Sequence, residues 1–167
     1  MSKSFVAILM GSDSDLPTMQ GTIDVLAKLG VATEVKITSA HRTPDATHAY
    51  VKDAEARGCA VFIAAAGLAA HLAGTVAGLT TRPVIGVPME GGPLNGFDAL
   101  LSTVQMPGGI PVATVAIGKV GAKNAGILAV QMLALSDATL SSRLKEFKES
   151  MAREVEEKDR VLQEKTA

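Results

Sequence analysis

The sequence places a histidine and an arginine next to each other in one short polar stretch. His41 and Arg42 follow Ser39 and Ala40 and precede Thr43. Histidine gains or loses a proton near neutral pH, and arginine offers a planar cationic fork that suits a phosphate or a carboxylate. The pair therefore predicts proton transfer on an anionic molecule. The alternative is that the stretch is a solvated loop between two elements.

The predicted elements on either side would place this pair at the edge of a sheet. Residues 34–37 alternate polar and apolar side chains, which predicts a strand. Thr43 can cap a helix over residues 44–57, and Pro44 fits its first turn without removing a needed N–H. In open α/β sheets, the edge between the carboxyl end of a strand and the next helix is where ligands bind.

A second polar turn follows six consecutive apolar residues, 5–10, which are typical of a parallel strand covered on both faces. This turn contains Ser12 and Asp15, and a helix is predicted over residues 16–29. A Gly-Ser turn before a helix can offer backbone N–H groups and a hydroxyl to a phosphate. We assign Ser12 to a phosphate, and Asp15 to a ribose hydroxyl or to the helix cap.

A third candidate segment follows the strand predicted over residues 60–65. Gly67, Leu68 and Ala69 begin a run of small apolar residues, in which His71 is the one polar side chain up to Gly74. Small side chains allow the backbone to approach a ligand, and the run would suit a pocket for a small uncharged molecule. The alternative is that His71 is a core or interface histidine.

Alternating strands and helices predict a three-layer, flavodoxin-like α/β fold. Its five-stranded parallel sheet would have helices on both faces, and an extra helix would follow at the carboxyl end. The remaining strands are predicted over residues 83–87 and 112–117, and the remaining helices over residues 97–106 and 122–135. The Ser12, His41 and Gly67 segments all follow strands, so they should meet at one edge. Residues 89–97 form a flexible segment that could act as a lid over that edge.

Composition excludes several classes of function. The net charge of −1 gives no general attraction for nucleic acid or an anionic membrane. The single Cys59 excludes an internal disulfide and a cysteine-based zinc site, and no acidic residue stands at metal-ligand spacing from the histidines. Dinucleotide-binding, Walker and Gly-x-Ser-x-Gly motifs are absent. We expect no metal, no cofactor and no membrane segment, and we expect a soluble cytoplasmic protein.

The last part of the chain predicts self-association. Residues 122–135 form an unusually apolar helix, which in so short a chain indicates a subunit interface. After it, apolar residues recur at steps of three and four on a highly charged helix. We therefore expect an α/β catalytic domain over residues 1–137 and an amphipathic helix over residues 138–167 that packs on a neighbouring subunit.

Several motifs in order resemble the 5-(carboxyamino)imidazole ribonucleotide mutase family of purine biosynthesis. The resemblance covers nearly all of residues 5–135, with Met-Gly-Ser-Asp-Ser-Asp at 10–15, Ser-Ala-His-Arg-Thr-Pro-Asp at 39–45, Ala-Ala-His-Leu at 69–72, Gly-Val-Pro at 86–88, Leu-Asn-Gly-Phe-Asp-Ala-Leu-Leu-Ser at 94–102, Val-Gln-Met-Pro-Gly-Gly-Ile-Pro-Val at 104–112 and Lys-Asn-Ala at 123–125.

The resemblance implies a mutase that uses neither ATP nor a metal and assembles as a homo-octamer. It implies that Ser12, Asp15 and Arg42 bind the ribonucleotide, that His41 moves the proton, and that Ser39 and His71 line the site. Released CO2 would stay against the wall formed by residues 67–72. Two alternatives remain: a related branch that carboxylates aminoimidazole ribonucleotide directly with CO2, and a non-catalytic nucleotide-binding module.

The chain departs from the family pattern at two positions. Leu68 stands where the family usually has glycine, and Ala73 where it usually has proline. A side chain at position 68 restricts φ and could reshape the wall against which CO2 is held.

The related carboxylase branch typically has lysine at the position of Arg42, so Arg42 favours the mutase.

Overall fold

The computed structural model describes residues 4–166, which form two compact units, one ending at Ala129 and the other beginning at Val130. The first unit contains a five-stranded sheet in which all neighbouring strands are parallel, in the order β2-β1-β3-β4-β5. The strands are β1 (Phe5–Met10), β2 (Ala32–Ile37), β3 (Cys59–Ala66), β4 (Val84–Pro88) and β5 (Ala113–Thr114).

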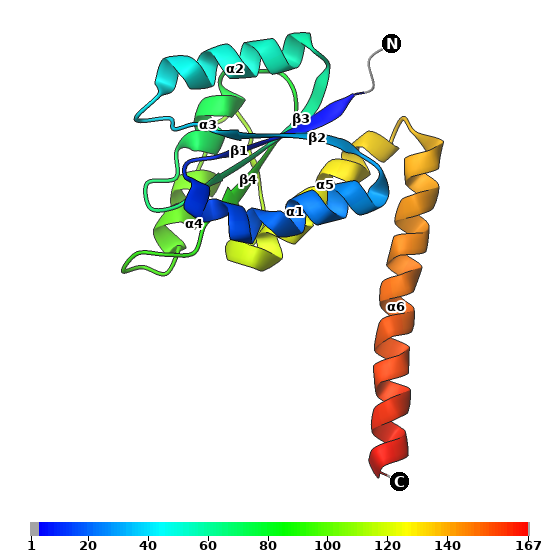
Figure 1. Cartoon of the computed structure of the whole chain (residues 1–167). Helices are drawn as coiled ribbons and strands as arrows, with labels where there is room; N and C mark the ends of the chain where they lie inside the picture. The colour runs from blue at the N-terminus through cyan, green and yellow to red at the C-terminus, as the bar shows by residue number, and fades with distance from the viewer. Residues whose placement is uncertain (1–3, 167) are drawn as a thin grey trace. The chain divides into compact units, whose positions relative to one another are not determined.

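Helices cover both faces of this sheet, as Figure 1 shows for α1 on one face and α2 on the other. The α-helices are α1 (Leu16–Leu29), α2 (Pro44–Ala56), α3 (Leu72–Ala77), α4 (Phe97–Val104), α5 (Gly118–Ala134) and α6 (Ala138–Thr166), and a short 3₁₀ turn (Asp13–Asp15) precedes α1. Thr22 of α1 donates a hydrogen bond to the Ala122 carbonyl of α5 over 2.6 Å, so these two helices lie on the same face. The predicted three-layer fold is confirmed.

The core of the first unit follows from its apolar strands. Every residue of β1 is buried, as expected for a central strand covered on both faces. Ala7 and Leu9 belong to one buried cluster with Val51 of α2 and Phe62 of β3. Successive side chains of a strand point to opposite faces, so the equally buried Ile8 faces the other helical layer.

The region between β5 and α5 differs from the prediction. The strand predicted over residues 112–117 is only two residues long, and α5 begins at Gly118 instead of Ala122. A Cβ atom at Gly121 would lie 1.5 Å from the Ala116 carbonyl oxygen, so the first turn of α5 packs directly against the backbone that precedes it. The chain therefore leaves the sheet early. The other boundaries agree with the prediction to within about two residues.

The second unit contains the end of α5 and the long helix α6. Leu140 and Phe147 of α6 are buried, whereas Met151, Val155 and Leu162 are exposed. The apolar stripe predicted for this helix is therefore covered only in its first half. Within residues 4–166, no helix is both long and apolar enough to cross a membrane.

Candidate active site

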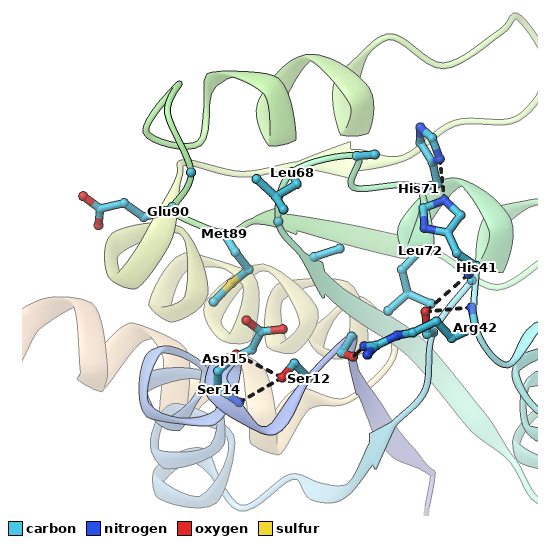
Figure 2. A pocket seen from close by; sticks show the side chains of 18 residues that line it. Ser12, Ser14, Asp15, His41, Arg42, Leu68, His71, Leu72, Met89 and Glu90 are labelled. Carbon is cyan, nitrogen blue, oxygen red and sulfur yellow. Dashed lines mark hydrogen bonds between the residues drawn. The ribbon is translucent and has the colours of Figure 1, made fainter.

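One cavity of about 530 Å³ lies at the carboxyl edge of the sheet. The segments that follow β1, β2, β3 and β4 all contribute to its lining (Figure 2). Every residue that the sequence singled out for the site lines this cavity: Ser12, Asp15, Ser39, His41, Arg42, Gly67, Leu68, Ala69 and His71. Their placement follows from the parallel sheet, because the carboxyl ends of all its strands meet at one edge.

The segment after β1 presents a hydroxyl and a carboxylate to the cavity. Ser12 occupies the N-cap of the 3₁₀ turn, where its Oγ accepts a hydrogen bond from the Ser14 N–H over 3.3 Å. Asp15 stands at the N-cap of α1 but makes no side-chain hydrogen bond to that helix. Asp15 therefore occupies the N-cap position without capping the helix through its side chain. Figure 2 shows its carboxylate on the cavity side.

Burial is the main reason that the pKa of Asp15 is raised above its ordinary value. A hydrogen bond with the Ser12 backbone opposes this shift, and the negative charge of Asp13 reinforces it. A partly buried carboxylate loses hydration, which hydrogen-bond donors on a ligand can replace. Asp15 is therefore suited to accept hydrogen bonds from hydroxyl groups.

The turn after β2 is shaped by its own hydroxyl groups. Ser39 Oγ accepts hydrogen bonds from the N–H groups of His41, over 3.3 Å, and Arg42, over 3.1 Å. Thr43 occupies the N-cap of α2, but its hydroxyl accepts a hydrogen bond from the Ser39 N–H over 2.9 Å instead of capping the helix. Ser39 thus lines the cavity and also fixes the backbone on which His41 and Arg42 stand.

Arg42 connects the first two segments of the site. Its guanidinium donates a hydrogen bond to the Gly11 carbonyl oxygen over 2.9 Å, as the dashed line in Figure 2 shows. This bond draws the cation toward the side of the cavity where Ser12 lies. A guanidinium and a serine hydroxyl together can bind an anionic group such as a phosphate.

His41 and His71 form a hydrogen-bonded pair on the opposite side of the cavity from Asp15 (Figure 2). The His41 Nε2 and His71 Nδ1 atoms are 2.8 Å apart, and the rings are nearly perpendicular, with an interplanar angle of 85°. Two imidazole nitrogens at this distance form a hydrogen bond in which one ring donates its N–H and the other ring accepts it. His71 is exposed and forms part of the cavity, so the structure places it outside the core.

The segment after β3 is held by a serine that no motif in the sequence singles out as part of the site. Ser102 of α4 accepts a hydrogen bond from the Ala70 N–H over 3.0 Å, and its hydroxyl is 3.3 Å from the Leu68 carbonyl oxygen. Leu68 has a φ of 54°, in the left-handed region that glycine adopts most readily. Ser102 is 34 residues away in sequence from Leu68, and no local pattern signals such a contact.

The segment after β4 also lines the cavity, with Met89, Glu90, Gly91 and Gly92. From the sequence, this segment is predicted only as a possible lid, and none of these residues is assigned to the site. Their position directly after a strand is the signal that could have identified them. Among residues 4–166, no group of three His, Cys, Asp or Glu side chains is arranged to hold a metal ion.

Comparison with known proteins agrees with this fold and identifies the family. The family model described as AIR carboxylase matches residues 5–154. The N5-carboxyaminoimidazole ribonucleotide mutase of Thermotoga maritima is 54% identical over 95% of this chain and 92% of its own length. The mutase of Pyrococcus horikoshii is 52% identical over 97% of this chain and 90% of its own length.

A solved structure is similar as well. The crystal structure of Treponema denticola PurE superposes with a TM-score of 0.85 and 31% sequence identity, covering 94% of this chain and 97% of the other. With a family match over nearly the whole sheet-containing unit and relatives more than half identical along the chain, this protein belongs to the AIR carboxylase family.

Proposed function

We propose that this chain is an N5-carboxyaminoimidazole ribonucleotide mutase, an isomerase of de novo purine biosynthesis. The reaction moves a carboxyl group from the exocyclic nitrogen to carbon 4 of the aminoimidazole ring. The observation on which the proposal rests is that one cavity combines anion-binding groups, a histidine pair and an apolar wall. The names of the curated relatives support the same reaction.

The ribonucleotide binds with its phosphate near Ser12 and Arg42. The bond from Arg42 to Gly11 brings the guanidinium to the segment that contains Ser12, which supports a shared phosphate site. Asp15 accepts hydrogen bonds from ribose hydroxyl groups, which replace the hydration that its burial removes. The cavity volume of about 530 Å³ lies within the range of small-molecule sites.

His41 transfers the proton in both halves of the reaction. Protonated His41 donates its proton to the exocyclic nitrogen while the bond from that nitrogen to the carboxyl carbon breaks. The electron pair of that bond stays on the nitrogen, and CO2 is released. Carbon 4 then forms a bond to CO2 with a ring electron pair, and neutral His41 removes the carbon 4 proton. Aromaticity is restored, and no proton or electron is gained or lost overall.

His71 orients His41 during these transfers. The hydrogen bond between the two rings fixes the direction of the His41 imidazole and gives its Nε2 a partner between proton transfers. Gly67, Leu68 and Ala69 form an apolar wall of the same cavity. A wall without polar side chains holds CO2 and limits the water that would hydrate it.

We further propose that the protein acts in the cytoplasm as a homo-octamer whose subunits contact one another through α5 and α6. The exposed apolar side chains near the ends of α5 support this assembly: Val120 is 67% exposed and Leu135 is 90% exposed. The exposed second half of the α6 stripe supports packing of residues 138–167 on a neighbouring subunit.

A paired assay tests the reaction. One sample contains N5-carboxyaminoimidazole ribonucleotide, and the other contains aminoimidazole ribonucleotide with excess bicarbonate; formation of 4-carboxy-5-aminoimidazole ribonucleotide is measured in both. We expect fast turnover only in the first sample, and we expect His41→Asn to abolish it. Efficient turnover in the second sample would instead assign the chain to the CO2-using carboxylases. Binding of the ribonucleotide without either reaction would indicate a non-catalytic binding module.

A further inference from the structure

A leucine in an unfavourable backbone conformation lies at the rim of the cavity. Leu68 is 55% exposed and has a φ of 54°. A residue with a Cβ atom pays about 1–2 kcal/mol for the left-handed conformation, and glycine does not. Partial exposure also means that Leu68 gains little from burial in the core. Packing in the core therefore does not explain why a leucine occupies this position.

The Leu68 side chain contacts the segment that follows β4. A Cβ atom built on Gly92 would lie 2.5 Å from Leu68 Cδ2, so one leucine methyl group lies directly against the Gly92 backbone. The same two segments also meet at their bases, where the Met89 N–H donates a hydrogen bond to the Ala66 carbonyl over 2.9 Å. Leu68 and Gly92 thus form a second contact, farther out along the same pair of segments.

The part of this segment that meets Leu68 is Gly91-Gly92, which has no side chains with which to anchor itself, whereas Met89 before it is buried. Gly91 and Gly92 are both exposed, and the turn that they begin is closed by its own backbone bond from the Gly96 N–H to the Gly91 carbonyl. The side chain at this point of contact is therefore supplied by Leu68. The Leu68 backbone is in turn fixed to α4 through Ser102.

We propose that Leu68 is a positioning residue that holds Gly91 and Gly92 against the cavity and so keeps released CO2 inside it. The proposal rests on the proposed function, in which CO2 is free between the two half-reactions. Leu68 is itself part of the apolar wall, and the role proposed here is its further effect on the position of Gly91 and Gly92. Without its side chain, the first half-reaction proceeds, but CO2 escapes more often before carbon 4 forms its new bond.

The fate of a labelled carboxyl group tests this role. The substrate has ¹³C in its carboxyl group, the buffer contains unlabelled bicarbonate, and mass spectrometry measures the label in the product and the aminoimidazole ribonucleotide released. Decarboxylation in an enzyme-free sample is subtracted. We expect the wild-type protein to retain most of the label. In Leu68→Ala, the ratio of lost to retained label should rise about threefold to tenfold. This is the size of effect expected when part of the buried apolar area of one leucine side chain is lost.

Three further variants separate the contact from backbone strain and from general loosening. Leu68→Gly removes the same contact but relieves the left-handed strain, so it should lose label as Leu68→Ala does. Gly92→Ala should increase label loss when Leu68 is present and add little in the Leu68→Ala protein, because the colliding methyl group is then absent. The φ of +65° at Gly92 is common to both backgrounds and cancels in this comparison. Leu94→Ala, on the same segment but outside the cavity lining, should retain label like the wild type.

The outcomes distinguish this proposal from the proposed function. If the wild-type protein forms no product from the labelled substrate, the proposed function is wrong and the role of Leu68 is wrong with it. If the wild type turns over but folded Leu68→Ala and Leu68→Gly retain label as well as it does, only the role of Leu68 is overturned. Equal loss of label in Leu94→Ala would also overturn it, because the effect would then be general.

Discussion

Two histidines face each other across 2.8 Å in the cavity, and only His41 has a predicted role in proton transfer. If His71 orients His41, replacing His71 should slow turnover with little effect on substrate binding. We expect His71→Asn to lower kcat by about 10- to 100-fold with KM nearly unchanged, because a hydrogen bond to a charged group contributes about 1.5–3 kcal/mol. Steady-state kinetics of the mutase reaction measure both constants.

The third histidine supplies the control for this prediction. His48 is an exposed residue of α2 and does not line the cavity. His48→Asn should therefore leave both constants at their wild-type values. An increase in KM with kcat preserved in His71→Asn would show that His71 acts in binding and would contradict an orienting role.

Asp15, the residue proposed to bind the ribose, lowers the stability of the folded protein. Its pKa is raised in the folded protein, mainly by burial, so the charged form is less favourable in the folded state than in the unfolded state. The penalty is present at neutral pH and disappears as the pH falls below the ordinary value of 3.8, where both states are protonated. Asp15→Asn should therefore raise the free energy of unfolding at pH 7, by less than about 1 kcal/mol at this partly exposed site.

Denaturant unfolding at several pH values and ribonucleotide binding test this prediction together. The stability gain of Asp15→Asn should shrink as the pH approaches 4, and the variant should bind ribonucleotide more weakly than the wild type. A gain of the same size at every pH would show that the carboxylate charge is not its source. Unchanged binding would contradict the assignment of Asp15 to the ribose.

Among single residues, the sequence predicts those that belong to a local pattern. Ser12, His41 and Gly67 each follow a predicted strand closely, so their shared edge could be inferred from the order of elements alone. Ser102 could not be inferred, because it reaches the site across 34 positions of sequence and resembles any hydroxyl on a helix. The contact between Leu68 and Gly92 likewise depends on how two loops meet in space.

At the scale of elements, the start of α5 depends on one close approach. A Cβ atom at Gly121 would lie 1.5 Å from the Ala116 carbonyl oxygen, which is backbone and cannot rotate away. We expect Gly121→Ala to lower the free energy of unfolding by about 3 kcal/mol or more, at or above the upper end of overpacking effects. Thermal and denaturant unfolding measure the change.

Gly108 is the matched control for this substitution. A Cβ atom at Gly108 would meet nothing within 4 Å, and its φ lies outside the left-handed region. Gly108→Ala should change stability by less than about 0.5 kcal/mol. Similar stability for the two alanine variants would mean that α5 can shift away from the Ala116 backbone.

The same close approach explains where the prediction of elements failed. Residues 112–117 have the apolar character of a buried strand, and hydrophobic patterning cannot distinguish a paired strand from an apolar segment under a helix. The early start of α5 over the Ala116 backbone ends β5 after Thr114. Strands and helices with clear boundaries, such as β1 and α1, were predicted over the residues that they occupy.

At the scale of the whole chain, the position of the cavity follows from the strand order. Connections run from β1 outward to β2 and then across to β3, so the order β2-β1-β3-β4-β5 reverses direction between β1 and β3. In open parallel sheets, such a reversal leaves a crevice at the carboxyl ends of the strands. Ser12 follows β1 and Gly67 follows β3, so these residues flank the reversal point, and His41 joins them from β2.

The proposed assembly gives a prediction at this scale. Val155 and Leu162 of α6 are 66% and 55% exposed and belong to the stripe whose first half is buried. If the second half packs on a neighbouring subunit, placing carboxylates there should break the contact, because an unpaired charge is costly to bury. We expect the double variant Val155→Asp with Leu162→Asp to form species of lower mass than the octamer proposed for the wild type, as measured by native mass spectrometry and light scattering.

A charge on the opposite face of the same helix tests whether position matters. Residue 142 is separated from the stripe by about half a helical turn at 3.6 residues per turn, and Ser142 is exposed. Ser142→Asp should therefore leave the mass of the assembly unchanged, although it also adds a negative charge to α6. If both variants form octamers, the second half of the stripe is not part of the interface, and α5 remains the candidate for the subunit contact. A smaller species in both would mean that any added charge on α6 disturbs assembly, so the contact could not be assigned to Val155 and Leu162.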